Sequence, residues 1–160
     1  MLNIVSSRGN QRVEKQIEDS PNAVRTGVRF ALYNIGVDLV KTAEAEMRKP
    51  KSGRWYTTKV GKQGTPLKKA RRYQASAPGQ APAVVSGNLR RSLRFKVRGW
   101  NVMSFRAGGE RFGAPYAPFL EEGTANMAAR PFMSTAVLEV EKDAINYFEI
   151  EIGKQLNKPV

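Results

Sequence analysis

The central stretch of this chain, from Met47 through Gly109, contains sixteen Lys or Arg residues and no Asp or Glu. Residues 1–46 carry six basic and six acidic side chains, and residues 110–160 carry five basic and eight acidic ones. The net charge of +13 is therefore +16 from the centre and −3 from the flanks. Charge gathered in this way produces a local potential that attracts a polyanion or an acidic protein surface. The plainer interpretation is a solvated basic loop on a soluble protein.

Length and composition favour one domain built around one hydrophobic core. The chain has 160 residues, of which 41% are hydrophobic, and a chain of this size buries roughly two thirds of its unfolded surface. We expect a single domain over residues 1–160. Within it, residues 1–18 are expected to be a flexible arm and residues 51–85 an extended basic loop.

The absence of two residue types restricts the chemistry of the chain. It has no Cys and no His, so disulfides, iron-sulfur clusters and thiolate zinc sites are excluded, and the usual general base is missing. We therefore expect no enzymatic activity and no cofactor. The first twenty residues contain no apolar signal-peptide core, and no run of 18 apolar residues occurs, so we expect a soluble protein without a membrane segment.

Two long periodic segments predict helices. The first begins after Asp19 and Ser20 with Pro21 and runs to about Arg48, before Pro50. Apolar residues recur there at three- and four-residue spacing, and they are Val24, Val28, Ala31, Leu32, Ile35, Leu39, Ala43 and Met47. The second begins at Pro131 and continues as one long helix to about Leu156.

Shorter elements are expected between these helices. Residues 54–60 and 70–74 are predicted to form the two arms of a hairpin, although Gly and Pro residues also make residues 51–87 typical of a long loop. Ser86 is predicted to cap a short helix over residues 87–93, and residues 95–98 and 102–107 alternate as an antiparallel strand pair. The expected fold is α+β: a small antiparallel sheet packed by a long N-terminal helix and a long C-terminal helix, with a long basic loop or hairpin excursion.

The basic excursion is the first candidate functional segment. Cations and aromatic side chains are interleaved in it, and the candidate contact residues are Arg54, Trp55, Lys59, Lys62, Lys68, Lys69, Arg71 and Arg72. This composition is typical of nucleic-acid binding, in which cations approach phosphates and aromatic rings stack on bases. It is equally typical of a segment that docks onto a protein, where Trp, Tyr and Arg are common anchors. Both interpretations stay open.

The adjacent carboxylates Glu121 and Glu122 are the second candidate. Acid-base catalysis needs two carboxyl groups that converge on one cleft, and neighbouring residues point in different directions. Without His, Cys or a third clustered acid, a structural ion pair between Glu121 and Arg130 is the favoured interpretation.

Four segments, taken in order, resemble the tail-completion (head-to-tail joining, neck) proteins of long-tailed bacteriophages. They are Ser76-Ala77-Pro78-Gly79-Gln80-Ala81-Pro82, Ser86-Gly87-Asn88-Leu89-Arg90-Arg91-Ser92-Leu93, Pro115-Tyr116-Ala117-Pro118-Phe119-Leu120-Glu121-Glu122-Gly123-Thr124, and Ala129-Arg130-Pro131-Phe132-Met133 with Ala136. Structural roles are implied for Leu89, Tyr116, Phe119, Glu121, Gly123, Thr124, Arg130, Pro131 and Phe132. Phe119, Phe132 and the Gly123-Thr124 turn are expected to pack the turn against the last helix.

The resemblance implies a virion structural protein of the tail neck, made in the host cytoplasm. Such a protein caps the head-proximal end of the tail tube as a homo-oligomeric ring, usually of six copies. Its implied partners are the tail tube protein, a head connector or stopper protein, and double-stranded DNA, which passes non-specifically through the lumen.

The size of the positive charge indicates where most of it points. A globule of this length is about 40 Å across, and duplex DNA carries one charge per about 1.7 Å, so a ring encloses roughly two dozen phosphates. Six copies of the central stretch bring 6 × 16 = 96 cations. Most of them must therefore face something else, and we expect an acidic surface on a neighbouring connector or tube protein. The alternative is a free-standing basic nucleic-acid-binding module, and a nuclease, which needs a carboxylate cluster, ranks last.

Overall fold

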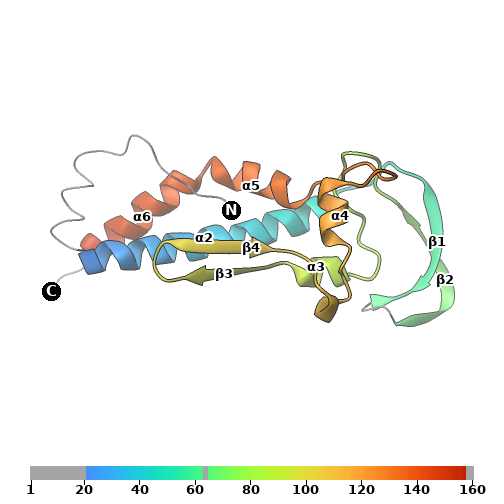
Figure 1. The fold of residues 1–160 in the computed structure, drawn as a ribbon, viewed down its shortest axis with the longest axis horizontal. Coiled ribbons are helices and arrows are strands. Elements are labelled where there is room, and N and C mark those ends of the chain that lie inside the picture. The colour runs from blue at the N-terminus through green and yellow to red at the C-terminus, as the bar shows by residue number, and fades with distance from the viewer. Residues whose placement is uncertain (1–20, 63–64, 158–160) are drawn as a thin grey trace.

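The structure, a computed structural model, describes residues 21–62 and 65–157, which form an elongated α+β arrangement (Figure 1). The predicted flexible arm at residues 1–18 lies outside the described residues. The helices are α2 (Pro21–Arg48), α3 (Asn88–Ser92), α4 (Ala117–Glu122), α5 (Met133–Glu141) and α6 (Ala144–Leu156), with a short 3₁₀ helix, η2 (Glu110–Phe112). The strands are β1 (Trp55–Val60), β2 (Pro66–Gln74), β3 (Arg94–Arg98) and β4 (Val102–Arg106).

Helix α2 is the element on which the body of the molecule is built. Helices α5 and α6 run along one side of it and the β3–β4 pair along another (Figure 1). Two glycines make these close contacts possible. A Cβ atom at Gly27 would lie 2.7 Å from the Cα of Ile152 in α6, and one at Gly36 would overlap the Phe95 ring in β3. Both positions therefore require the smallest residue.

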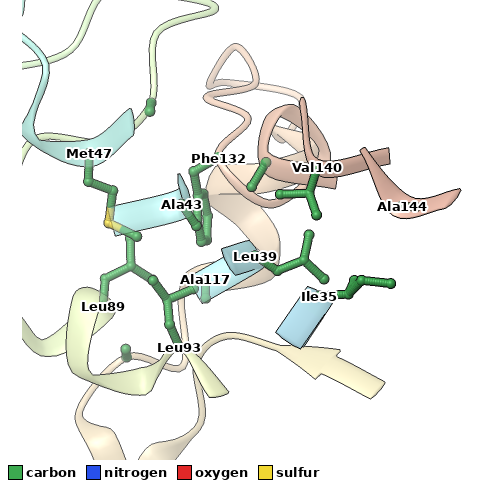
Figure 2. Close-up of a cluster of buried hydrophobic side chains, with 13 residues drawn as sticks. Ile35, Leu39, Ala43, Met47, Leu89, Leu93, Ala117, Phe132, Val140 and Ala144 are labelled. Atoms are coloured by element: carbon green, nitrogen blue, oxygen red, sulfur yellow. The ribbon is translucent and has the colours of Figure 1, made fainter. Parts of the chain in front are cut away.

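The apolar periodicity of α2 predicts its buried face correctly. Seven of its eight apolar repeat positions are fully buried, and Val28 is half-buried. Leu39, Ala43 and Met47 belong to one buried cluster with side chains from α3, α4 and α5. Figure 2 shows Leu89 and Leu93 on one side of α2 and Phe132 and Val140 on the other. Phe132 has no solvent exposure. The core thus joins the first predicted helix to segments more than forty residues away in sequence.

The predicted single C-terminal helix is wrong, because the chain forms two helices separated at Lys142 and Asp143. Asp143 is the N-cap residue of α6, with a non-helical φ of −105°. The new helix direction keeps α6 in contact with α2 (Figure 1): the Tyr147 hydroxyl donates a hydrogen bond to Asp38, and the Asn34 amide donates one to Glu151 at 3.3 Å. These polar contacts and the Gly27 approach hold α6 in place.

The strands form two separate two-stranded antiparallel sheets rather than one. The β3–β4 pair was predicted, and its register places Phe95 opposite Phe105 and Val97 opposite Met103. An isolated two-stranded sheet is marginally stable in water, so the packing of Phe95 against α2 supports this pair. The β1–β2 pair lies beyond the C-terminal end of α2, at one end of the molecule (Figure 1).

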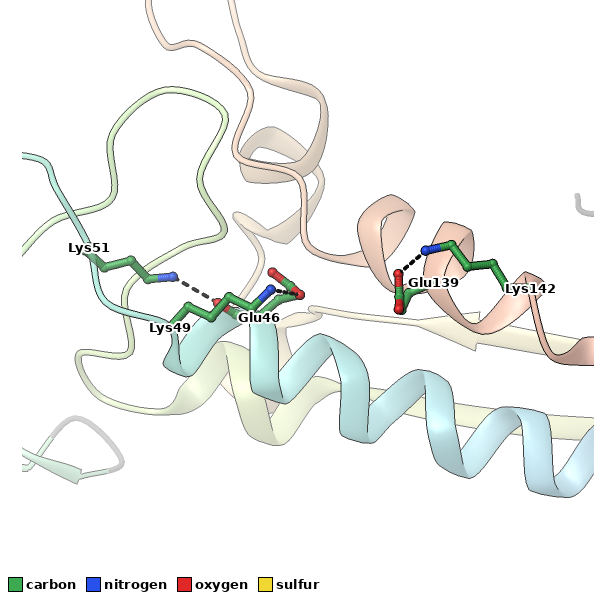
Figure 3. A network of polar contacts seen from close by, with 5 residues as sticks. All are labelled: Glu46, Lys49, Lys51, Glu139 and Lys142. Carbon is green, nitrogen blue, oxygen red and sulfur yellow. Dashed lines mark hydrogen bonds and ion pairs between the residues drawn. The ribbon is translucent and has the colours of Figure 1, made fainter.

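The C-terminal end of α2 carries a small polar network (Figure 3). The Lys49 ammonium lies 2.5 Å from a Glu46 carboxylate oxygen, and the Lys51 ammonium donates to the Glu46 carbonyl at 3.0 Å. Cations near the last carbonyls of a helix are favourable because of the helix dipole. Desolvation lowers the pKa of Lys51, and the Glu46 carboxylate partly opposes this effect. Helix α2 ends at Arg48, as Pro50 predicts, and β1 begins at Trp55.

Candidate functional site

The predicted basic excursion folds as a hairpin of β1 and β2. Trp55 pairs with Gln74, Tyr56 with Tyr73 and Thr58 with Arg71, and an irregularity follows between Thr58 and Val60. Strand β2 begins at Pro66, four residues earlier than predicted. We call residues 54–62 and 65–74 the basic hairpin. The hairpin alternative of the sequence analysis is therefore correct for the described residues of this segment.

Backbone and side-chain hydrogen bonds fix the base of the basic hairpin to the body. Gly53 and Arg54 exchange backbone hydrogen bonds with Ala75, each at 2.9 Å. The side-chain amide oxygen of Gln80 accepts hydrogen bonds from the backbone amides of Ser52 at 3.1 Å and Ala77 at 3.0 Å. One side chain thus joins both strands' roots to the Pro-rich segment. Sequence analysis placed Gln80 in a motif but assigned it no role.

Each face of the basic hairpin carries aromatic rings and cations. Side chains of paired residues lie on the same face of an antiparallel pair, so Trp55 and Arg72 share one face, and the Arg72 guanidinium lies 5.3 Å from the Trp55 ring centroid. Tyr56 and Tyr73 stack on the other face with centroids 5.9 Å apart. Arg71, on that second face, donates a hydrogen bond to the Val85 carbonyl. The first face is therefore the one turned away from the body.

No carboxylate neutralises the cations of the basic hairpin within the described part of the chain. The five ion pairs among the described residues all join residues 38–49 or 139–154. All eight predicted contact residues are exposed, namely Arg54, Trp55, Lys59, Lys62, Lys68, Lys69, Arg71 and Arg72. The structure thus brings the predicted set together on one projecting element and leaves its charge available to a partner.

The four motif segments converge beside the base of the hairpin. The Gly79 amide donates to the Ala129 carbonyl at 2.9 Å, and the Arg130 amide donates to the Leu120 carbonyl at 2.7 Å. A cavity of about 190 Å³ lies between them, and its walls include Leu89, Tyr116 and Arg130. Segments distant in sequence therefore form one structural unit. Burial raises the pKa of the Tyr116 hydroxyl at its edge.

Glu121 caps helix α5 and does not pair with Arg130, so the predicted ion pair is wrong. Its carboxylate accepts hydrogen bonds from the backbone amides of Phe132 at 2.9 Å, Met133 at 3.0 Å and Ser134 at 2.7 Å, and from the Ser134 hydroxyl at 2.6 Å. The N-cap residue, Phe132, has no side-chain acceptor. A carboxylate from α4 therefore satisfies amides that helix α5 leaves unpaired.

The titration of Glu121 reflects this capping role. Burial alone raises the pKa of a carboxyl group, but the hydrogen bonds from the Ser134 hydroxyl and from the amides of residues 132–134 outweigh burial. The net result is a pKa of Glu121 below its usual range. The side chain is therefore an anchor held in its charged form, and its neighbour Glu122 is exposed and takes no part.

The remaining motif residues have mixed outcomes. Leu89 and Phe132 are core residues, but Phe119 is 58% exposed, so its predicted packing against the last helix is wrong. Gly123 has a φ of +80°, and a Cβ there would lie 2.8 Å from the Ala129 amide. The Thr124 amide closes the turn by donating to the Met127 carbonyl at 2.8 Å. Pro131, half-buried, directly precedes the N-cap residue of α5.

Comparisons with family models, curated proteins and solved structures give no match to this chain. Within residues 21–62 and 65–157, no helix is both long and apolar enough to cross a membrane. The same residues contain no group of three or more metal-ligating side chains.

Proposed function

We propose that this chain is a tail-completion protein of a long-tailed bacteriophage. In this proposal, six copies form a ring that caps the head-proximal end of the tail tube in the virion neck. The ring joins the tail to a connector or stopper protein of the DNA-filled head, and double-stranded DNA passes through its lumen. The role is structural rather than catalytic.

The observation that carries the proposal is the basic hairpin. It projects from one end of an elongated body (Figure 1), and its cations have no carboxylate partner among the described residues. An element of this kind is suited to reach a separate anionic protein surface, because it places Trp and Arg anchors on a face turned away from the body.

The motif unit supports the same proposal. The four segments that carry the family resemblance form a common structure around Leu89, Tyr116 and Arg130. The Glu121 cap fixes helix α5 to this unit. The hairpin base is joined to it through Gln80. Hydrogen bonds therefore connect the hairpin, the motif unit and the helical body, which suits a protein that joins two larger structures.

The test is charge reversal on the basic hairpin. Lys68→Glu, Lys69→Glu and Arg72→Glu together change the charge by six units and leave Arg71, which bonds to the Val85 carbonyl, in place. In phage that carry this variant, electron microscopy is expected to show full heads and finished tails that remain separate. Complete particles in normal yield would contradict the docking role of the hairpin.

A matched control makes the same change of charge elsewhere. Arg98→Glu, Arg106→Glu and Arg111→Glu replace three exposed cations outside the hairpin, and none of these side chains makes a hydrogen bond or ion pair with residues 21–62 or 65–157. We expect complete particles with this control. Equal failure of both variants would attribute the defect to net charge alone.

A second candidate function is a free-standing nucleic-acid-binding module, which the stacked Tyr56 and Tyr73 and the Arg72–Trp55 contact favour. Such a module binds duplex DNA tightly as a monomer, and its log affinity falls by about 0.9 per phosphate contact for each log unit of salt. A joining protein binds DNA weakly until it is assembled. Titration of the isolated chain with DNA at several salt concentrations separates the two functions.

A further inference from the structure

An aromatic groove lies at the end of the molecule away from the basic hairpin. It is open, has a volume of about 940 Å³, and lies between the N-terminal half of α2 and the turn that joins β3 to β4. Phe30 and Tyr33 of α2 and Trp100 of the turn remain 48%, 55% and 43% exposed. Tyr33 contacts Phe95 edge to face, with centroids 5.3 Å apart. We call this surface the aromatic groove.

The charged residues of the aromatic groove are all cationic within the part of the chain that the structure describes. They are Arg25, Arg29 and Lys96. The Arg25 guanidinium lies 5.8 Å from the Trp100 ring centroid. Exposed aromatic patches of this kind, surrounded by charge, mark interaction surfaces. Two such grooves repel each other, so the occupant must combine apolar side chains with carboxylates.

The outer face of α5 and α6 has this complementary composition. Leu138, Ile145 and Ile150 are exposed by 65%, 67% and 54%. Glu151 faces α2, and the exposed charges of α5, α6 and the two residues between them are Glu139, Glu141, Asp143 and Glu149 against Lys142 and Lys154, a balance of −4 + 2 = −2. The charged residues of the groove carry +3. The two surfaces of the same chain therefore both expose apolar side chains and have opposite charge.

The two surfaces are presented by different sides of α2. Tyr147, Phe148 and Glu151 of α6 face α2, so Ile145, Glu149 and Ile150 lie on the outward side of that helix. The groove is formed with β3, which packs on another side of α2 (Figure 1). One copy therefore cannot fill its own groove with its own α6.

We propose that the aromatic groove of one copy binds the outer α5–α6 face of a second copy. The contact is heterologous, because it joins two different surfaces, and repetition of a heterologous contact produces a ring or a filament rather than a closed dimer. The inference rests on the proposed function, which requires a ring, and it names the surfaces that build that ring.

The chain contains no Cys, so introduced thiols test the contact cleanly. Groove variants Phe30→Cys and Tyr33→Cys are mixed pairwise with helix variants Leu138→Cys and Ile145→Cys, then treated with a short bis-maleimide. We expect a covalent dimer in the mixtures of groove and helix variants, and its loss when either variant is treated alone. All four positions are at the surface, and unchanged circular dichroism spectra establish that each variant is folded.

A charge exchange tests the complementarity directly. Arg29→Glu in the groove copy is expected to reduce the yield of covalent dimer about tenfold, which corresponds to roughly 1.4 kcal/mol of binding free energy. Glu149→Arg in the helix copy is expected to restore the yield. Restoration requires that the two residues face each other across the contact, and its absence would contradict the proposed pairing.

Three outcomes overturn the inference. The first is no cross-link from any groove and helix pair at the highest concentration at which the chain stays in solution. The second is a single variant that cross-links to itself as efficiently as the mixtures do, because this indicates a contact between identical surfaces. The third is a dimer from Lys68→Cys with Ile145→Cys in place of the groove pairs, because this assigns the acidic face to the basic hairpin.

The failure of this inference and the failure of the proposed function give different results. The hairpin variant with Lys68, Lys69 and Arg72 reversed retains both groove and helix surfaces, so it is expected to cross-link normally and yet leave tails unjoined. Normal cross-linking with normal joining refutes the docking function alone. If the hairpin variant leaves tails unjoined but no mixture of groove and helix variants cross-links, the self-association alone is refuted.

Discussion

Replacement of Glu121 tests whether the capping contact between α4 and α5 stabilises the motif unit. Glu121→Gln keeps the length of the side chain and one carbonyl acceptor, but it removes the charge and replaces the second oxygen with an amide that cannot accept a hydrogen bond. Glu121→Ala removes both oxygens and leaves the amides of Phe132, Met133 and Ser134 without their present acceptor. Both variants retain the core residues.

The expected magnitude follows from the number and type of contacts. Loss of a capping side chain costs about 0.5–2 kcal/mol, and a carboxylate at a helix N-terminus contributes a further 0.3–1 kcal/mol, roughly, through the dipole. We expect a loss of about 2 kcal/mol in the free energy of unfolding for Glu121→Ala and about 1 kcal/mol for Glu121→Gln. For a chain of this size, about 2 kcal/mol lowers Tm by roughly 4–8 °C.

The pH dependence of the Glu121→Gln effect gives an independent measurement. Because the pKa of Glu121 is lower in the folded chain than its ordinary value of 4.5, the charged side chain stabilises the fold above about pH 4.5. This contribution is lost as the pH falls through the folded pKa. The stability difference between the wild-type chain and Glu121→Gln is therefore expected to be largest near neutral pH and to shrink in acid.

Glu122→Gln is the matched control, because Glu122 is adjacent and exposed and its side chain makes no hydrogen bond or ion pair with another described residue. Denaturant unfolding followed by circular dichroism, repeated across the acidic range, measures all three variants. A change below about 0.5 kcal/mol is expected for the control, as for most surface substitutions. If Glu121→Gln and Glu122→Gln behave alike at every pH, the capping argument is refuted.

Two further substitutions probe the contacts of α2. Gly36→Ala is expected to destabilise the chain by about 1–3 kcal/mol through overlap with the Phe95 ring. The higher helix propensity of Ala alone predicts a gain in stability of about 1 kcal/mol. A lower Tm would therefore support the steric overlap, and a higher Tm would refute it. Tyr147→Phe removes the hydrogen bond to Asp38 and is expected to cost about 1 kcal/mol in denaturant unfolding; an unchanged midpoint would show that this bond adds nothing to the docking of α6.

The sequence predicts best where local pattern and burial agree. The apolar spacing of α2 and the alternation of β3 and β4 each specify one face, and the structure buries that face of α2 and half-buries that face of the β3–β4 pair. The break between α5 and α6 escapes the same reasoning because Val140 and Ala144 are four residues apart and both buried. The helical period therefore continues through the break, and no Gly or Pro marks it.

The site was predicted in part, because its charge is a property of the sequence and its contacts are not. The basic hairpin follows from composition, whereas the role of Glu121 depends on where α4 ends relative to the start of α5. One indication was present: Phe132 directly follows Pro131 at the helix start and has no polar side chain to serve as a cap. The aromatic groove had no such indication, since Tyr33 and Trp100 come together only when β3 packs on α2.

The length of α2 separates the two surfaces proposed to act in assembly. Its 28 residues span about 42 Å at 1.5 Å per residue, with the aromatic groove near the first three turns and the basic hairpin beyond the last. The three cations of the groove face the net negative outer side of α5 and α6 in this proposal, so self-association uses none of the charge on the hairpin. The hairpin cations therefore remain for a partner outside the ring.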